Sequence, residues 1–222
     1  MAFTSFRFIV FLVLAAAAYF LTPKRCRWVT LFVANYVFSF ISGGRIFIYL
    51  LATTVTTYLA TVKIGDMAAK NKIAFNEAKA ELDKEGKKAW KAAFAKKKKR
   101  ILIPTLLFNF GILAVLKYSG FVTENLNLLF AKIGIGTELP VFRFLLPLGI
   151  SFYTFQSMGY LIDVYREKQE PERNFCKLAL FISFFPQIVQ GPISRFGTLA
   201  EQLFRANEFS YTRIKFGVQL ML

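Results

Sequence analysis

Apolar runs recur along this chain, and they constrain its fold more than any other feature. Six runs cover residues 6–21, 28–42, 46–62, 101–118, 142–165 and 175–193, and another starts at 214. A helix that crosses about 30 Å of hydrocarbon needs ~20 mostly apolar residues, with ~17 as the lower edge. Because these runs are apolar on nearly every face, a large soluble helical core is the weaker alternative. The sequence therefore predicts an all-α, polytopic bundle of transmembrane helices, of which the first two are short or tilted.

The charged residues lie between the apolar runs. The chain has 29 Lys and Arg against 13 Asp and Glu, and residues 63–100 alone hold 13 basic residues against five acidic ones. Cytoplasmic loops of membrane proteins collect Lys and Arg, so residues 63–100 are predicted to be a basic cytoplasmic loop. Residues 22–27 and the segment after Val164 are also basic, and alternate crossing puts both on the same side as that loop. This pattern predicts a multi-pass protein with its N-terminus outside.

The basic loop has an apolar face of its own. Trp90, Ala93 and Phe94 recur at helical spacing, and Asp83 precedes Lys87 by four residues, as in a supporting helical ion pair. The pattern is typical of an amphipathic helix that lies on anionic membrane lipid. A solvated loop that only sets topology is the preferred interpretation, and a docking site for an acidic carrier protein is a weaker alternative. No nucleic-acid partner is predicted, because the topology already accounts for the lysines.

Two residue counts exclude several kinds of site. The chain has no histidine, which excludes a Ser-His-Asp or Cys-His site and the usual His-containing zinc sites within these residues. Its two cysteines, Cys26 and Cys176, form no CxxC pair, so neither a disulfide framework nor a thiolate metal cage is expected. No bound metal or cofactor is predicted. The N-terminal run also has features of a cleavable signal peptide, but the basic residues 24–27 argue against a translocated flank.

The run over 142–165 carries a polar stripe. Spacings of four, three, four and three residues put the following side chains on one helical face: Gly149, Tyr153, Gln156, Tyr160 and Asp163. A polar stripe is costly against lipid, so it should face other helices or a water-filled cavity. Interhelical packing and the wall of a substrate conduit are both open as its role. Asp163 and Arg166 are one turn apart, and we expect them to pair near the cytoplasmic interface.

The run over 175–193 contains two helix-breaking pairs, Pro186-Gln187 and Gly191-Pro192. Irregular backbone at membrane depth is tolerated where it is buried in protein or lines a cavity. A broken or re-entrant element is therefore predicted, and a single proline-kinked helix is the alternative. Arg195 and Arg205 follow, and they are typical of an interfacial helix.

Two linked motifs carry a family resemblance. They are LLPLGISFYTFQSMGYLIDVYR (Leu145–Arg166) and FFPQIVQGPISRF (Phe184–Phe196), and they resemble the membrane-bound O-acyltransferase (MBOAT) family. The pattern is closest to its bacterial branch of alginate O-acetyltransferases and teichoic-acid D-alanyl transferases. The resemblance covers essentially the whole chain, as the N-terminal portion of a family member.

The resemblance implies an enzyme that moves an acyl group, most simply acetyl, from acetyl-CoA or another thioester to hydroxyls of a cell-surface or secreted polysaccharide. It implies location in the bacterial cytoplasmic membrane and a secreted or periplasmic partner protein. The family's histidine base lies in the second half of the chain and is absent here, so no catalytic residue is carried over and the fragment alone is expected to be inactive. The motif residues expected to support the site or line its conduit are Tyr153, Gln156, Tyr160, Asp163, Arg166, Gln187, Gly191, Pro192 and Arg195. D-alanyl transfer to teichoic acid, and a non-catalytic membrane scaffold or transporter fragment, are the alternatives.

Overall fold

The computed structural model describes residues 6–43, 47–79, 83–134, 139–140, 149–188, 194–205 and 207–221. Within these ranges all regular secondary structure is helical, which confirms the predicted all-α class. The elements are α1 (Phe6–Leu21), η1 (Lys24–Cys26), α2 (Arg27–Gly43), α3 (Phe47–Ala78), α4 (Lys84–Ile133), α5 (Ile150–Tyr165), α6 (Phe175–Ser183), α7 (Phe185–Ile188), α8 (Phe196–Phe204) and α9 (Tyr211–Met221).

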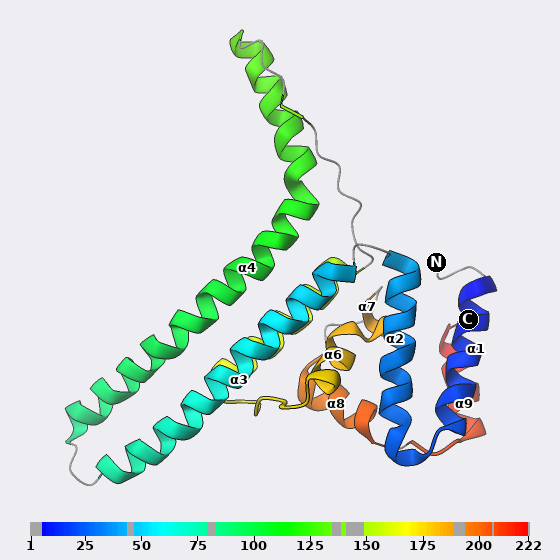
Figure 1. Cartoon of the computed structure of the whole chain (residues 1–222), viewed down its shortest axis with the longest axis horizontal. Coiled ribbons are helices and arrows are strands. Elements are labelled where there is room, and N and C mark those ends of the chain that lie inside the picture. The colour runs from blue at the N-terminus through cyan, green and yellow to red at the C-terminus, as the bar shows by residue number, and fades with distance from the viewer. Residues whose placement is uncertain are drawn as a thin grey trace.

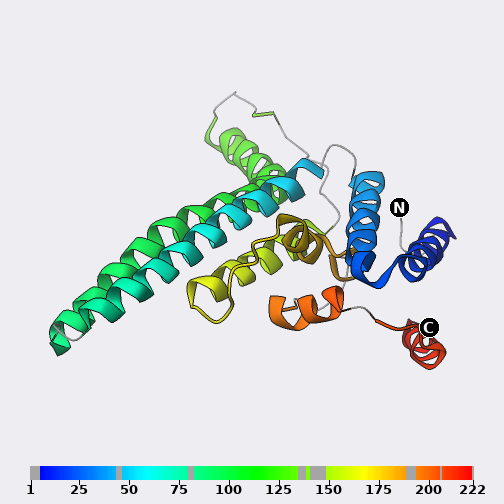
Figure 2. The ribbon, with the colours of Figure 1, turned by 60° about the horizontal axis from the view of Figure 1, so that its bottom comes forward.

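The basic segment, predicted as a loop that contains an amphipathic helix, forms a helical hairpin. α3 continues through the basic residues as far as Ala78, and α4 begins at Lys84 and runs for 50 residues, about 75 Å at 1.5 Å per residue. The two helices lie side by side, and their connected ends project from the rest of the molecule (Figures 1 and 2). The helix predicted over 101–118 is thus the middle of α4. Gly134, at φ 80°, ends it in the left-handed conformation that glycine adopts without strain.

The predicted amphipathic helix is the start of α4, and Trp90 of its apolar face packs on α3. The Trp90 indole N–H donates to Asn71 Oδ1 at 3.0 Å, and its ring lies 6.1 Å from that of Phe75. The expected Asp83–Lys87 side-chain pair is also replaced by another arrangement. Asp83 is the N-cap of α4, and its carboxylate accepts a hydrogen bond from the Gly86 N–H.

α5 is the centre of the bundle. It packs against α3, α4, α6 and α7, and α2 packs against α6 on the far side. Completely buried side chains at this centre include Ile64, Leu161 and Leu178. α3 contributes buried threonines, of which Thr54 and Thr61 donate to the backbone carbonyls four residues earlier. A threonine satisfied within its own helix presents mainly its methyl group to neighbours, so α3 packs closely although its buried face carries hydroxyl groups.

The basic connections lie at one end of the bundle. Figure 1 shows the α1–α2 turn, the connected ends of α3 and α4, and the α5–α6 loop towards the same side. Ion pairs tie the α5–α6 loop to the hairpin: Lys98–Glu167 at 2.5 Å and Arg173–Asp66 at 2.7 Å.

Among the residues that the structure describes, α3 and α4 are long and apolar enough to cross a membrane, and α1 and Phe175–Gln187 are shorter apolar segments. Large apolar side chains remain exposed along both long helices, such as Leu59 at 61% and Leu107 at 68%. An exposed apolar surface of this kind needs lipid or further protein to cover it.

Candidate functional site

The second motif is built around a break between two helices. α6 ends at Ser183, Phe184 leaves the helical conformation, and α7 begins at Phe185. Pro186 falls in the first turn of α7, where its missing N–H costs no helical hydrogen bond. The predicted break is therefore present, although it precedes Pro186, and a continuous proline-kinked helix is excluded for these residues.

Gln156 on α5 satisfies one side of the break. Its side chain is 4% exposed, and its Nε2 donates to the Phe181 carbonyl at 2.9 Å. The last carbonyls of a helix have no partner within that helix. The side-chain amide of Gln156 therefore satisfies one of the free carbonyls at the end of α6. This contact is the interhelical packing role that was one of the two possibilities for the polar stripe.

Asn35 on α2 satisfies the other side. It is completely buried, its Oδ1 accepts a hydrogen bond from the Phe185 N–H at 2.7 Å, and its Nδ2 donates to the Leu31 carbonyl. The sequence analysis did not single out Asn35. It is the one carboxamide within the apolar run over 28–42, which could have indicated a buried hydrogen-bonding role.

Aromatic rings from the first two helices hold the start of α7. The Phe185 ring lies 5.1 Å from that of Phe38 on α2, and 5.6 Å from Phe11 and 6.2 Å from Phe8 on α1. Such edge and tilted contacts contribute beyond buried area alone. The backbone groups at the break are thus hydrogen-bonded to the side-chain amides of Gln156 and Asn35, and the Phe185 ring packs against α1 and α2.

Two tyrosines of the stripe have different environments. The Tyr160 hydroxyl accepts a hydrogen bond from the Glu172 N–H at 2.7 Å, and its ring lies 4.8 Å from Phe196. The Tyr153 hydroxyl is buried and has no hydrogen-bond partner within the described ranges. Tyr160 therefore fixes packing, whereas Tyr153 keeps an unused polar atom inside the bundle.

Asp163 and Arg166 do not meet, which corrects the predicted pair. Asp163 is half-buried and Arg166 is exposed, and no ion pair joins them in the structure. α5 ends at Tyr165, and Arg166 already lies in the turn that Glu167 continues at φ 58°. The Arg166 N–H still donates to the Ile162 carbonyl at 2.9 Å, so the two residues remain one turn apart and only their side chains fail to meet.

The rest of the second motif is described in part. Gln187 Nε2 donates to Ser194 Oγ at 2.9 Å, while its Oε1 is buried without a partner among the described residues. Arg195 is the exposed N-cap residue of α8, the helix expected at the interface. Gly191 and Pro192, predicted as motif residues, lie outside the described residues.

The described residues at the break are mostly neutral amides and hydroxyls. Such groups orient a substrate by hydrogen bonds, but they do not exchange protons readily near neutral pH. No cluster of Cys, Asp or Glu with a metal-binding arrangement occurs in the described part of the chain. The arrangement can position a bound group by hydrogen bonds.

Comparison with known proteins gives the chain its relatives. A protein of Azotobacter vinelandii named probable alginate O-acetylase AlgI is 32% identical over 219 residues, which are 97% of this chain and 38% of that protein. The chain belongs to the membrane-bound O-acyltransferase family. The AlgI protein of Pseudomonas aeruginosa is 31% identical over 97% of this chain and 36% of its own length. A peptidoglycan O-acetyltransferase of Helicobacter pylori is 30% identical over 143 residues, 53% of this chain and 26% of that protein.

This MBOAT chain spans under two fifths of the length of its AlgI relatives. That partial coverage fits the predicted N-terminal portion of a family member. Membership of this family, together with the two long apolar helices, identifies a membrane protein. No family profile matches the chain, and no solved structure matches it.

Proposed function

We propose that the whole protein is a membrane-bound O-acetyltransferase that acetylates hydroxyls of a cell-surface or secreted polysaccharide. The observation that carries the proposal is similarity over 97% of the chain to proteins named alginate O-acetylase, which includes both motifs. The peptidoglycan O-acetyltransferase of H. pylori supports the same reaction type with another glycan.

The reaction joins a thioester donor, acetyl-CoA or a related thioester, to a sugar hydroxyl. The hydroxyl oxygen attacks the thioester carbonyl, the C–O bond forms as the C–S bond breaks, and the hydroxyl proton passes through a base to the leaving thiolate. The chain has no histidine, so we assign that base to none of these residues. A secreted or periplasmic partner that completes transfer to the polymer belongs to the same proposal.

These residues contribute the frame of the reaction chamber. Gln156 and Asn35 hold the broken helix, and the unpartnered polar atoms of Tyr153 and Gln187 are available to line the conduit. We further propose that the protein lies in the bacterial cytoplasmic membrane with its N-terminus outside. The basic turn that contains Cys26 then faces the cytoplasm.

Acetate release tests the function. A strain that lacks the gene, complemented with the full-length protein, should yield surface polysaccharide that releases acetate on mild base treatment. The matched control is the same strain carrying an empty vector. Release of D-alanine in place of acetate would favour transfer to teichoic acid, and release of neither would favour a non-catalytic scaffold.

Cysteine labelling tests the orientation. In a variant whose only cysteine is Cys26, which is exposed, a membrane-impermeant maleimide should react in inverted vesicles and not in intact cells. The reverse labelling would contradict the proposed topology. A matched variant has its single cysteine at exposed Lys132, close to the C-terminal end of α4 and far from the basic end of that helix. It should react in intact cells and not in inverted vesicles.

A further inference from the structure

The exposed face of α4 changes from cations to apolar side chains within one turn. Four exposed side chains form a stripe along this face, at spacings of four, three and four residues: Lys96, Arg100, Ile103 and Leu107. In a membrane protein, such a change marks the depth at which a helix passes from the hydrocarbon to the lipid headgroups, because long basic side chains reach the interface there. The stripe therefore offers a basic end and an apolar end on one helix face.

The same change occurs on α3 at the same depth. Leu59 and Lys63 are one turn apart, and both are exposed. Two interhelical hydrogen bonds fix the register of the antiparallel helices: Thr56 with Asn109, and Asn71 with Trp90. Lys63 lies about midway between these contacts on α3, and Arg100 lies about midway between them on α4, so the two cations are level. The paired helices thus become basic together, directly beyond their exposed apolar surface.

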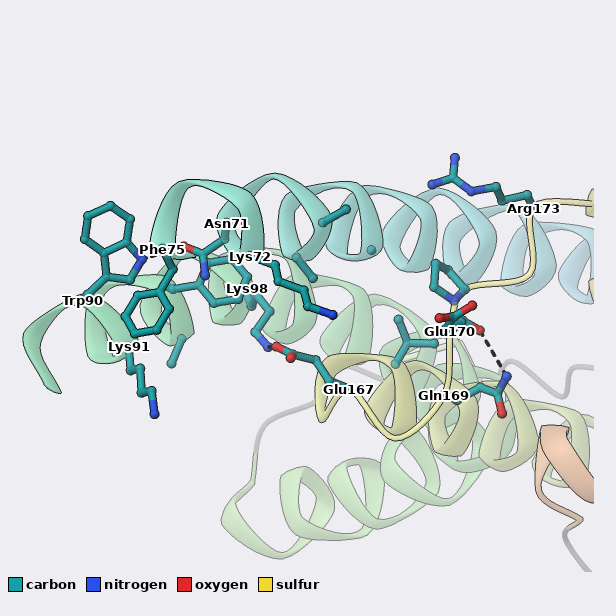
Figure 3. Close-up of a pocket in the computed structure, with 17 residues that line it drawn as sticks. Asn71, Lys72, Phe75, Trp90, Lys91, Lys98, Glu167, Gln169, Glu170 and Arg173 are labelled. Carbon is teal, nitrogen blue, oxygen red and sulfur yellow. Dashed lines mark hydrogen bonds and ion pairs between the residues drawn. The ribbon is translucent and has the colours of Figure 1, made fainter. Parts of the chain in front are cut away.

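Lys98 does not belong to this exposed basic surface. It points into a groove between α3, α4 and the loop that follows α5, where its ammonium contacts Glu167 (Figure 3). It also donates to the Tyr165 carbonyl at 2.9 Å. Its charge is therefore satisfied inside the protein, where the hairpin meets the bundle.

The exposed cations have no such partner. The side chains of Lys63, Lys96 and Arg100 make no ion pair and no hydrogen bond among the residues that the structure describes. Asp66, the acid nearest to Lys63 in the sequence, is already paired with Arg173. A group of unpaired cations at the surface attracts anions from outside the protein.

We propose that the basic end of the stripe binds the headgroup of an anionic phospholipid. The Arg100 guanidinium donates paired hydrogen bonds to the phosphate, and the Lys96 ammonium, one turn away, adds a second positive charge. The acyl chains lie along Ile103 and Leu107. The same combination of side chains on α3 extends the site around the hairpin.

The apolar end of the stripe distinguishes lipid from other anions. A soluble anion or an acidic protein surface would pair with the cations but would leave Ile103 and Leu107 exposed to water. A zwitterionic phospholipid fits the apolar end, but its headgroup carries a cation that Lys96 and Arg100 repel. An anionic amphiphile satisfies both ends.

Headgroup binding fixes how deep the hairpin sits. α4 is about 75 Å long, more than twice the ~30 Å of hydrocarbon in a bilayer, so its length alone does not set its depth. An anionic headgroup on the stripe sets the point at which the two helices leave the membrane. The charged arms are then held at a constant distance from that leaflet.

Brominated lipids test the site, because bromine quenches the fluorescence of a tryptophan that it contacts. The reporter is Leu107→Trp in the full-length protein, reconstituted with brominated phosphatidylglycerol or brominated phosphatidylcholine in place of part of the unbrominated lipid. The fluorescence of protein without the added tryptophan is subtracted. The two quenching curves give the affinity for phosphatidylglycerol relative to phosphatidylcholine beside the stripe, and we expect a preference of at least about fivefold.

Neutral substitutions locate that preference. In the reporter background, Lys96→Gln/Arg100→Gln should reduce it to within about twofold of unity, since the attraction to the phosphate charge is removed. The matched variant Lys84→Gln/Lys88→Gln removes two exposed lysines with the same spacing, twelve residues nearer the start of α4 or about 18 Å away. Because that separation exceeds the Debye length of about 8–10 Å, its preference should stay within about twofold of the parent value.

Other results would overturn the proposal. Absence of quenching by either lipid would show that protein covers the stripe, and equal quenching by both lipids in the parent would show no preference for anionic headgroups. Equal losses in the two double variants would assign the preference to the total charge of the hairpin. A preference unchanged by Lys96→Gln/Arg100→Gln would place the headgroup contacts elsewhere.

The four substituted cations are all exposed, and equal melting temperatures would show that the variants fold as the parent does. The parent reporter tests the proposal even without them, since it must distinguish the two lipids. Quenching does not depend on acetyl transfer, so failure of the proposed function would leave this test intact.

Discussion

The helix break and the helical hairpin both bury polar groups, but they do so with different chemistry. At the break, neutral carboxamides of Asn35 and Gln156 meet backbone groups inside the bundle. At the hairpin, a lysine and an arginine meet carboxylates whose side chains are about half exposed. Burial of an ion costs far more than burial of an amide, so charge is suited only to the end where water is near.

This difference sets an order of expected effects. A backbone group that loses its only partner in a dry interior carries the full cost of desolvation, whereas an exposed ion pair contributes little because water replaces it. Variants at the break should therefore destabilise the protein more than variants at the hairpin or in the terminal loops.

The largest effect is expected from Asn35→Leu. The leucine fills a similar volume but leaves the buried Phe185 N–H without an acceptor, which should lower the free energy of unfolding by about 2–3 kcal/mol. SDS titration of the purified protein in mixed micelles measures this value. Acetate release should fall as well, because the second motif loses its anchor.

Asn109→Leu is the matched control for Asn35. Asn109 is equally buried, but its interhelical partner is the Thr56 hydroxyl, which already donates to the Ala52 carbonyl of its own helix. Its loss strands no backbone N–H and should cost about 1 kcal/mol or less. Equal effects of the two substitutions would contradict the role assigned to Asn35.

A smaller effect is expected where the bundle meets the hairpin, at Gly65. A Cβ at this position would lie 2.3 Å from Pro171 Cγ, and the proline ring has little freedom to move aside. Gly65→Ala should therefore destabilise by about 1–2 kcal/mol, as overpacking does, despite the better helix propensity of alanine. Thermal unfolding in detergent measures the change.

Gly159→Ala separates crowding from helix propensity. Gly159 is also helical, but a Cβ there meets nothing within 4 Å. We expect this variant to be as stable as the parent or slightly more stable. Destabilisation of both variants to the same extent would exclude close contact with Pro171 as the cause.

Periodicity and helix breakers were sufficient to predict the all-α class and the break in residues 175–193. Residue type also placed Gln156 and Tyr160 on a face that packs inside the bundle. Side-chain partners were beyond such reasoning, because Asn35 and Phe185 are 150 residues apart and nothing local links them.

The sequence predicted one amphipathic helix within the basic segment, and the structure has two paired helices there. Positive charge predicts which side of a membrane a segment occupies, but it does not oppose helix formation, and Lys and Ala are good helix formers. The pairing of the two helices depends on long-range packing, because Trp90 on α4 contacts Asn71 and Phe75 on α3. The predicted apolar face is present on α4, and Trp90 on that face packs against α3.

The next effect concerns a single member of the lysine run. Lys98 is 7% exposed and donates to the Tyr165 carbonyl and to Glu167, whereas Lys97 is exposed. Lys98→Met should lower the free energy of unfolding by about 1 kcal/mol. The loss is no larger because Glu167 stays in contact with water after its partner is removed. Lys97→Met should lie within about 0.5 kcal/mol of the parent. Urea or SDS titration compares the two, and equal costs would remove the distinction drawn between these lysines.

The smallest effect is expected at the surface pair Lys24–Glu208, which joins the α1–α2 turn to the segment before α9 at 2.8 Å. The hydrogen bond and charge of Lys24 lower the pKa of the Glu208 carboxyl. A carboxyl whose pKa is lowered by folding adds stability above its unfolded pKa, and that contribution disappears as the pH falls through the folded value. Both side chains are largely exposed, so Glu208→Gln should leave the melting temperature unchanged within error at pH 7 and at pH 3. A clear loss at pH 7 that vanishes at pH 3 would mean that an exposed charge pair stabilises this protein, and the contrast between amides inside and charges outside would then fail.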